Sequence, residues 1–224
     1  MNGTWAVLVA AGRGERLGTK RPKAFARLAG RPLLAESVER LDASEWVDAV
    51  VIVAPPDWEE PAILLSEELG AGKVAAAVPG GETRADSVRA GLAEVPDEAA
   101  ALLVHDAARP LLSEEIVERV LRALGDGWDG VVPGLPLADT VKRVDGDTIV
   151  ETIDRSGLYA VQTPQAFVAA TLRRALAAPG AALSDCAGYV EAAGGRVTVV
   201  EGDPRLVKVT TAADLDFVET LLAR

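Results

Sequence analysis

Short apolar runs alternate with amphipathic helical patterns over the first 133 residues, and this alternation restricts the fold more than any other feature. Apolar runs suited to buried strands occur at 5–11, 47–54, 73–78, 99–105 and 130–133. Helical patterns lie between them at 33–41, 58–69, 83–95 and 113–124. Strands that are apolar throughout are typical of parallel sheets covered on both faces. We therefore predict an α/β fold with a mostly parallel sheet and helices on both faces.

The pattern changes after residue 133. The segment "DTVKRVDGDTIVETID" contains two short β-like runs around Asp145, Gly146 and Asp147, which predicts a hairpin. Beyond it, the sequence predicts helices at 165–178, 184–193 and 211–222, and strands at 196–201 and 206–209. We expect the hairpin to form an arm on the sheet domain.

Composition limits the chemistry. The chain has 224 residues, 49% of them hydrophobic and 25% charged, which is enough for one sizeable core and predicts a single domain over residues 1–224. The net charge of −11 disfavours a nucleic-acid surface. Cys186 is the only cysteine and His105 the only histidine, so an internal disulfide and a Cys/His zinc site are excluded. A Cys/His nucleophile pair stays open.

The first apolar run does not indicate a membrane or export signal. Residues 5–11 are too few to span a bilayer. No basic segment precedes them and no cleavage pattern follows them. We therefore expect a cytoplasmic protein.

A basic loop follows this first predicted strand. The segment "LVAAGRGERLGTKRPK" (Leu8–Lys23) contains three glycines and five basic residues, a composition suited to phosphate. It lacks the glycine spacing of a P-loop. It also has Leu17 where the dinucleotide-binding pattern needs its third glycine, and the second strand ends without the acidic residue of that pattern. The loop therefore predicts a phosphate site of another kind, or else a solvated basic loop.

Two further segments follow strands. "GGETRADSVRAGL" places two glycines between a strand and a helix, with Arg84 and Ser87 nearby, so backbone amides could approach a ligand closely; a plain tight turn would look the same. "LLVHDAARP" brings Asp106 and Arg109 to a strand end, and Ser113 would cap the next helix. A carboxylate facing a phosphate loop favours an intervening Mg²⁺. The alternative is a surface Asp–Arg pair, and we expect His105 to be a buried, hydrogen-bonded histidine.

Taken together, these segments resemble one family along nearly the whole chain. "LVAAGRGERLGTKRPKAF", "GGETRADSVRAGL", "VHDAARP", "DTVKR", "DRSGLYAVQTPQAF" and "VKVTTAADL" occur in the order seen in 2-C-methyl-D-erythritol 4-phosphate cytidylyltransferases of non-mevalonate isoprenoid synthesis. The resemblance implies a Rossmann-like sheet of the nucleotidyltransferase type with a protruding β-arm at about residues 136–160 that serves dimerisation. The bifunctional members of this family carry an additional cyclase domain, for which 224 residues would leave no room.

The resemblance also implies roles for individual residues. The catalytic pair would be Arg16 and Lys23, at the reacting phosphate, and Asp106 would bind Mg²⁺. CTP would contact Ala10, Ala11, Gly12, Gly81, Glu82 and Ser87. Methylerythritol phosphate would contact Arg109, Thr140, Arg155 and Lys208. Cys186 stands where many members have an acidic residue.

The implied reaction is attack by the 4-phosphate of 2-C-methyl-D-erythritol 4-phosphate on the α-phosphorus of CTP, which releases pyrophosphate. Positioning and charge stabilisation suffice for such a step, and an ionised phosphate needs no general base. The implied active unit is a homodimer whose acceptor site is shared between subunits. Two alternatives stay open, a cytidylyltransferase acting on a pentitol phosphate such as ribitol 5-phosphate and a non-catalytic nucleotide-binding regulator. A dinucleotide oxidoreductase fits worst.

Overall fold

The structure is a computed structural model that describes residues 3–12, 14, 17, 21–178 and 183–223. Arg16, one of the two predicted catalytic residues, lies outside the described residues. In the described part of the chain, no helix is both long and apolar enough to cross a membrane.

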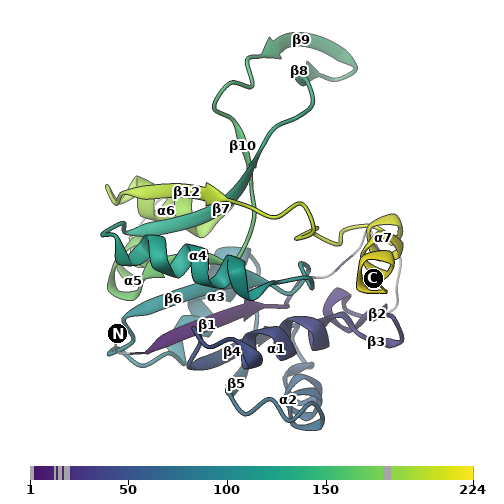
Figure 1. Cartoon of the computed structure of the whole chain (residues 1–224), viewed down its shortest axis with the longest axis vertical. Coiled ribbons are helices and arrows are strands. Elements are labelled where there is room, and N and C mark those ends of the chain that lie inside the picture. The colour runs from purple at the N-terminus through teal and green to yellow at the C-terminus, as the bar shows by residue number, and fades with distance from the viewer. Residues whose placement is uncertain (1–2, 13, 15–16, 18–20, 179–182, 224) are drawn as a thin grey trace.

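An eight-stranded sheet forms the centre of the described structure (Figure 1). Its parallel half has the order β6-β1-β4-β5. The bounds of these strands are β1 Thr4–Val9, β4 Ala49–Ala54, β5 Val74–Pro79 and β6 Ala101–Asp106. They agree with the runs predicted from the sequence to within two residues. The predicted α/β fold with a mostly parallel sheet is confirmed.

The other half of the sheet mixes strand directions. β11 (Gln165–Val168) lies antiparallel between β6 and β7 (Gly130–Pro136), and β10 (Tyr159–Val161) continues beside β7 in the antiparallel sense. β12 (Val197–Glu201) pairs with β7 in parallel. Two short strands, β2 (Arg27–Leu28) and β3 (Arg31–Pro32), form a separate antiparallel pair beyond the first loop.

Helices cover both faces of the sheet, and side chains alternate between two cores. One core packs beneath α1 (Leu33–Ala43), α2 (Glu59–Glu68) and α4 (Glu114–Gly125). The other packs beneath α3 (Arg84–Ala93), α5 (Ala169–Ala177) and α6 (Cys186–Ala192). In β1, Ala6 and Leu8 enter the first core whereas Val7 enters the second, as the two-residue period of a strand requires. This burial on both faces explains why the central strands are apolar throughout.

A third, smaller cluster forms beside the first loop. α7 (Ala212–Leu222) contributes Val218 to this cluster, in which Leu28, Leu33 and Val209 are also buried. The helix begins with a capping box in which Thr211 and Asp214 bond each other's backbone N–H groups. α7 thus packs beside β2 and Leu33, and Leu33 also lines the cavity described below.

Three local predictions were wrong. Residues 165–168 form β11 rather than the start of a helix, because they fill a gap between β6 and β7 with ladder bonds on both sides. Residues 206–209 form no strand; Leu206 and Val209 are buried, but Val209 N bonds Ala108 O in the turn after β6. Ser113 occupies the N-cap position of α4, yet its side chain makes no capping hydrogen bond. For residues 165–168, hydrophobic periodicity alone could not distinguish a short apolar strand from the start of a helix.

The predicted hairpin is confirmed and extends away from the sheet (Figure 1). β8 (Val141–Asp145) and β9 (Thr148–Ile153) pair antiparallel, and Gly146 in their turn has a φ of 55°. Such a φ suits glycine because other residues meet steric strain there. We call residues 137–158, from the end of β7 to the start of β10, the arm.

Candidate active site

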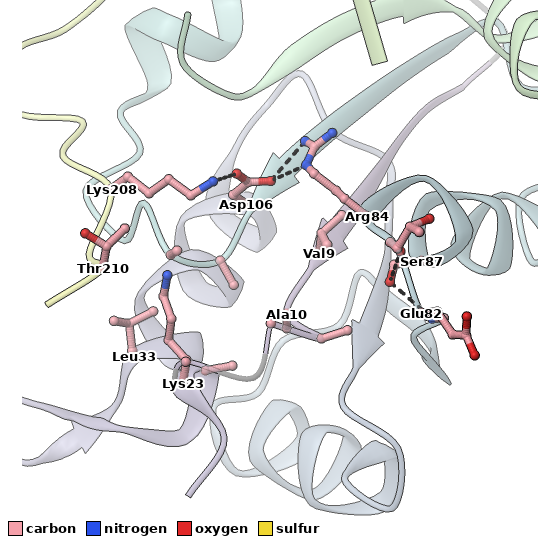
Figure 2. A pocket seen from close by; sticks show the side chains of 18 residues that line it. Val9, Ala10, Lys23, Leu33, Glu82, Arg84, Ser87, Asp106, Lys208 and Thr210 are labelled. Carbon is pink, nitrogen blue, oxygen red and sulfur yellow. Dashed lines mark hydrogen bonds and ion pairs between the residues drawn. The ribbon is translucent and has the colours of Figure 1, made fainter. Parts of the chain in front are cut away.

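A cavity of about 560 Å³ opens at the carboxyl ends of β1 and β6. That volume lies within the usual range for small-molecule sites. Its lining includes Val9 to Gly12, Gly14, Lys23, Ala24, Leu33, Gly81 to Arg84, Ser87, Asp106 to Ala108, Lys208 and Thr210 (Figure 2). Ligands of open parallel sheets bind at this edge, so the cavity lies where the fold predicts a site.

Lys23 and the described residues of the loop after β1, 10–12 and 14, form one wall of the cavity. Ala10 N bonds Val53 O at 2.8 Å, which continues the pairing with β4 just past the end of β1. Gly14 has a φ of 69°, and a Cβ there would lie 2.5 Å from Lys23 Cβ. Phe25 packs on Trp58 with ring centroids 4.5 Å apart, which anchors the short helix Lys23–Phe25. Glycine therefore permits the close approach that brings Lys23 against the loop.

Residues 80–83, which join β5 to α3 and are called the second loop below, form another wall of the cavity. Ser87 Oγ accepts a hydrogen bond from Gly81 N at 3.2 Å and donates one to Thr83 O at 3.1 Å. A Cβ on Gly80 would collide with the side chains of Ala11 and Ser87, so the two loops touch. Thr83 caps α3, whose N-terminal end therefore faces the cavity. Backbone N–H groups at such a helix end favour an anion.

Asp106 lies between two cationic side chains (Figure 2). Arg84 donates to Asp106 Oδ1 from Nε at 3.0 Å and from Nη2 at 2.9 Å. Lys208 Nζ donates to Oδ2 at 2.7 Å. The Arg84 side chain is 24% exposed and that of Lys208 is 43% exposed, so Lys208 is the partner that a ligand reaches more easily.

The two cations determine the ionisation of Asp106. Burial by itself would raise the pKa of this carboxyl, because it disfavours the charged form. The charges of Arg84 and Lys208 outweigh burial and lower the pKa of Asp106 well below its ordinary value. Asp106 is therefore a carboxylate at neutral pH.

Cys186 lies beneath the ion pair. Its Sγ is 3.5 Å from Arg84 Nη1, and burial raises the pKa of the thiol to about 11. A protonated thiol is a poor nucleophile. The Cys/His nucleophile pair left open by the sequence is not formed, because His105 bonds other groups.

His105 is buried and hydrogen-bonded, as expected. Its Nδ1 lies 3.2 Å from Thr163 Oγ1 and its Nε2 lies 3.1 Å from Arg109 O. Arg109 O can only accept, so the neutral ring donates from Nε2 and its Nδ1 accepts from the Thr163 hydroxyl. Thr163 Oγ1 also accepts a hydrogen bond from Asp106 N at 3.0 Å. Burial lowers the pKa of His105 to about 4. Because its two nitrogens bond Arg109 O and Thr163 Oγ1, the ring supports the backbone turn that carries Asp106 and Arg109.

The structure brings most of the predicted site residues together. The cavity lining contains Ala10, Ala11, Gly12, Lys23, Gly81, Glu82, Ser87, Asp106 and Lys208. Arg109 lies outside the lining, and its guanidinium donates to Leu206 O at 2.7 Å and Val161 O at 3.4 Å. Thr140 and Arg155 are exposed on the arm, away from the lining.

The set predicted from the sequence omitted Arg84 and Thr210, which also line the cavity. In the sequence, Arg84 is close to Ser87 but belongs to none of the predicted contacts. Its position as the first residue of α3, directly after the capping Thr83, was the available signal. Thr210 gave no signal of its own, because it reaches the cavity only through the path of residues 202–210.

Asp106 is the described residue best suited to hold a divalent cation. Among the described residues, no group of three or more His, Cys, Asp or Glu side chains converges. Mg²⁺ commonly takes one or two carboxylates together with substrate phosphates and water. One ionised carboxylate at this edge of the sheet would suit a cation held mainly by the phosphates of a bound nucleotide. It does not fit a site built by protein ligands alone.

The fold and the cavity define the class of protein as a nucleotidyltransferase-type α/β enzyme. A glycine-containing loop, a lysine and an ionised carboxylate meet at the carboxyl edge of a parallel sheet. The family model of 2-C-methyl-D-erythritol 4-phosphate cytidylyltransferase matches residues 4–224, and the chain belongs to this family.

Relatives and solved structures agree with this membership. The 2-C-methyl-D-erythritol 4-phosphate cytidylyltransferase of Frankia casuarinae is 48% identical over 220 residues, covering 98% of this chain and 81% of that protein. That of Nocardia farcinica is 48% identical over 220 residues, covering 98% and 94%. The crystal structure of the Thermus thermophilus enzyme is 34% identical with a TM-score of 0.81, covering 97% of this chain and 98% of that one.

Proposed function

We propose that the cavity described above is the active site for the reaction of the family. The reaction transfers a cytidylyl group from CTP to 2-C-methyl-D-erythritol 4-phosphate and forms 4-diphosphocytidyl-2-C-methyl-D-erythritol and pyrophosphate. The observation that supports this placement is the meeting of Lys23, Asp106 and Lys208 with two glycine loops in one cavity. The whole chain would act as one nucleotidyltransferase domain, with a dimerisation arm at about residues 136–160.

The chemistry is a single displacement at phosphorus. An oxygen of the acceptor's 4-phosphate forms a bond to the α-phosphorus of CTP, and the bond to the bridging oxygen of pyrophosphate breaks with its electron pair. The segment Ala10–Gly12 would hold the triphosphate through the amides of Ala11 and Gly12, since Ala10 N is already bonded to Val53 O. Gly81, Glu82 and Ser87 would contact the cytidine. Lys23, together with Arg16, would offset the negative charge that develops on the α-phosphate.

Asp106 would hold Mg²⁺ against the phosphates. When bound there, the ion would supply positive charge beside the reacting phosphates. Asp106 is suited to this role because it stays ionised despite burial. Lys208 would then pass from the carboxylate to the acceptor's phosphate, since the same ammonium group can donate to either anion.

The acceptor would be held between two subunits of a homodimer. Val144, Ile149 and Val150 on the hairpin are 59%, 60% and 55% exposed, so a large part of their apolar surface has no cover within the described chain. An isolated two-stranded hairpin is marginal in water, which favours packing against a second copy. Thr140 and Arg155 would thereby reach the acceptor site of the second copy, formed by Lys208 of the partner subunit and, next to the cavity, Arg109 of the partner subunit. A cytoplasmic location stays a prediction from the sequence.

One assay tests this function. Pyrophosphate release is measured with CTP and Mg²⁺, with 2-C-methyl-D-erythritol 4-phosphate or ribitol 5-phosphate as acceptor. We expect release that depends on methylerythritol phosphate, with kcat/KM at least about 100-fold higher than for ribitol 5-phosphate because polar acceptor contacts discriminate strongly. A preference for ribitol 5-phosphate would show that the acceptor is a pentitol phosphate instead. Binding of CTP without pyrophosphate release in the presence of either acceptor would indicate a regulator.

A further inference from the structure

Gln162 belongs to the "VQTPQ" segment, to which neither the sequence nor the proposed reaction assigns a function. Its side chain is buried, with 6% of the residue exposed. The carboxamide bonds the backbone of a distant segment three times. Oε1 accepts from Asp203 N at 3.0 Å, and Nε2 donates to Asp203 O at 2.9 Å and to Leu206 O at 3.4 Å.

The segment that Gln162 holds carries part of the cavity wall. Residues 202–210 follow β12 without forming a helix or a strand, and they deliver Lys208 and Thr210 to the cavity. Because this segment lacks a ladder, its path depends on individual hydrogen bonds. Besides those from Gln162, two contacts fix it to the turn after β6, Arg109 Nη1 to Leu206 O at 2.7 Å and Val209 N to Ala108 O at 2.8 Å.

Gly202 provides an independent sign that the fit is close. A Cβ on this residue would collide with Gln162 Oε1 and would lie 3.1 Å from Gly134 O. Gly202 N also donates to Gly134 O at 2.9 Å, and Gln162 N donates to Pro133 O at 2.7 Å. Gln162 is thus held by β7 through its backbone while its side chain holds the segment that carries Lys208.

We propose that Gln162 is a positioning residue for Lys208. It would touch no substrate itself; it fixes the backbone from which the Lys208 ammonium reaches Asp106 in the ligand-free enzyme and the acceptor's phosphate during the reaction. The inference rests on the proposed role of Lys208 and deepens it. It also predicts that disturbing Gln162 affects the acceptor and leaves CTP binding nearly unchanged, because the CTP contacts lie on other loops.

The test compares Gln162→Met, Gln162→Glu and Gly202→Ala with Lys208→Ala. Methionine has a similar length and makes none of the three hydrogen bonds. Glutamate keeps the oxygen that accepts from Asp203 N but loses both hydrogen bonds that the amide donates. Gln165→Met is the matched control, because Gln165 is also a buried amide of the same segment and bonds Asp185 instead. Calorimetry measures binding of methylerythritol phosphate to the full-length enzyme with a non-hydrolysable CTP analogue, and binding of the analogue alone. Circular dichroism confirms folding.

We expect Gln162→Met to weaken acceptor binding about tenfold and binding of the CTP analogue less than twofold, the size typical of lost supporting contacts to a ligand-binding group. Gln162→Glu and Gly202→Ala should weaken acceptor binding in the same direction, and Gln165→Met should not. Adding Gln162→Met to Lys208→Ala should cause no further loss, because the two residues act through one contact.

The inference would be overturned if the losses of acceptor binding in Gln162→Met and Lys208→Ala were additive. It would also be overturned if Gln162→Met weakened binding of the acceptor and of the CTP analogue equally. A lowered Tm with unchanged binding would show that Gln162 is only structural. If Gln162→Met should fail to fold, the Gln162→Glu and Gly202→Ala results decide in its place. Unchanged acceptor binding in Lys208→Ala would instead contradict the proposed role of Lys208 itself, so the two failures are distinguishable.

Discussion

The position of Lys23 in the cavity has both a local and a tertiary cause. Pro22 and the short helix Lys23–Phe25 fix its backbone, and Gly14 permits the close approach of the first loop. We expect Lys23→Ala to lower kcat about 100-fold or more, as the loss of a fixed electrostatic stabiliser does, with a smaller change in KM for CTP. Steady-state kinetics with CTP and methylerythritol phosphate measure this. An unchanged kcat with a raised KM would mean that Lys23 only binds the nucleotide.

Asp106 allows a sharper test of the metal. Asp106→Asn keeps the shape of the side chain but removes its charge, and a neutral amide is a poorer ligand for a hard cation. We expect a rise of about tenfold or more in the Mg²⁺ concentration needed for half-maximal rate, or loss of activity. Binding of Mn²⁺ in the presence of a non-hydrolysable CTP analogue, followed by electron paramagnetic resonance, provides a readout independent of turnover. Wild-type Mn²⁺ binding in the variant would refute the assignment.

His105 gives a prediction about pH. Its folded pKa of about 4 lies below the ordinary value of 6.5, so between these values the unfolded chain binds a proton that the folded chain does not. Stability due to neutral His105 is therefore present above pH 6.5 and is lost as the pH falls toward 4. From pH 7 to 5 this one group should lower the free energy of unfolding by about 2 kcal/mol.

Urea unfolding of the wild type and of His105→Gln at both pH values measures this contribution. Glutamine does not titrate, so the variant should lose less stability between pH 7 and 5 than the wild type. Equal losses would show that His105 ionises alike in both states. Because His105 is the only histidine, no other imidazole contributes to the difference.

At the scale of elements, α7 stabilises one wall of the cavity. Asp214 accepts hydrogen bonds from Thr210 N, Thr210 Oγ1 and Thr211 N at 2.8, 2.6 and 2.8 Å. The Thr210 hydroxyl is the main cause that lowers the pKa of Asp214 to about 2. These bonds join the start of the helix to a residue that lines the cavity.

We expect Asp214→Ala to lower the free energy of unfolding by about 1 kcal/mol, because the capping box and the contact with Thr210 are lost together. Asp216→Ala is the control, since it removes the same charge from the same helix without touching the capping box. Denaturant unfolding of both variants provides the comparison. Equal losses would mean that the helix start contributes only through its charge.

At the scale of the whole molecule, the proposed dimerisation arm would determine how many subunits one site needs. Arg155 donates to Leu137 O at 3.0 Å within the arm and does not reach the cavity of its own chain. Mixing inactive Lys23→Ala subunits with inactive Arg155→Ala subunits tests whether it serves a partner. In the heterodimer, one site receives both wild-type residues, so random exchange should restore about a quarter of the sites.

Native mass spectrometry verifies that heterodimers have formed, and pyrophosphate release measures the activity that returns. Heterodimers without activity would place Arg155 at its own chain's site or at none. A chain that remains monomeric at assay concentration, yet active, would contradict the shared site directly.

The sequence by itself determined the order and type of most elements. Apolar runs on either side of amphipathic helices require a covered parallel sheet, so the loops holding Lys23, Gly81 and Asp106 had to meet at one edge. The turn sequence around Gly146 determined the hairpin because glycine is favoured at its φ. Individual site residues came from the resemblance to the family, since basic loops and strand-end carboxylates also occur without function.

The tertiary structure alone decided the contacts between distant segments. Residues 165–168 became a strand only because a gap between β6 and β7 could take their backbone bonds. Arg84 and Lys208 meet Asp106 from 22 and 102 residues away, and Gln162 holds Asp203 from 41 residues away. No local pattern encodes such pairs, because they depend on strand order and on the path of a segment without regular hydrogen bonding. For this reason the ionisation of Asp106 and the support of Lys208 became visible only in three dimensions.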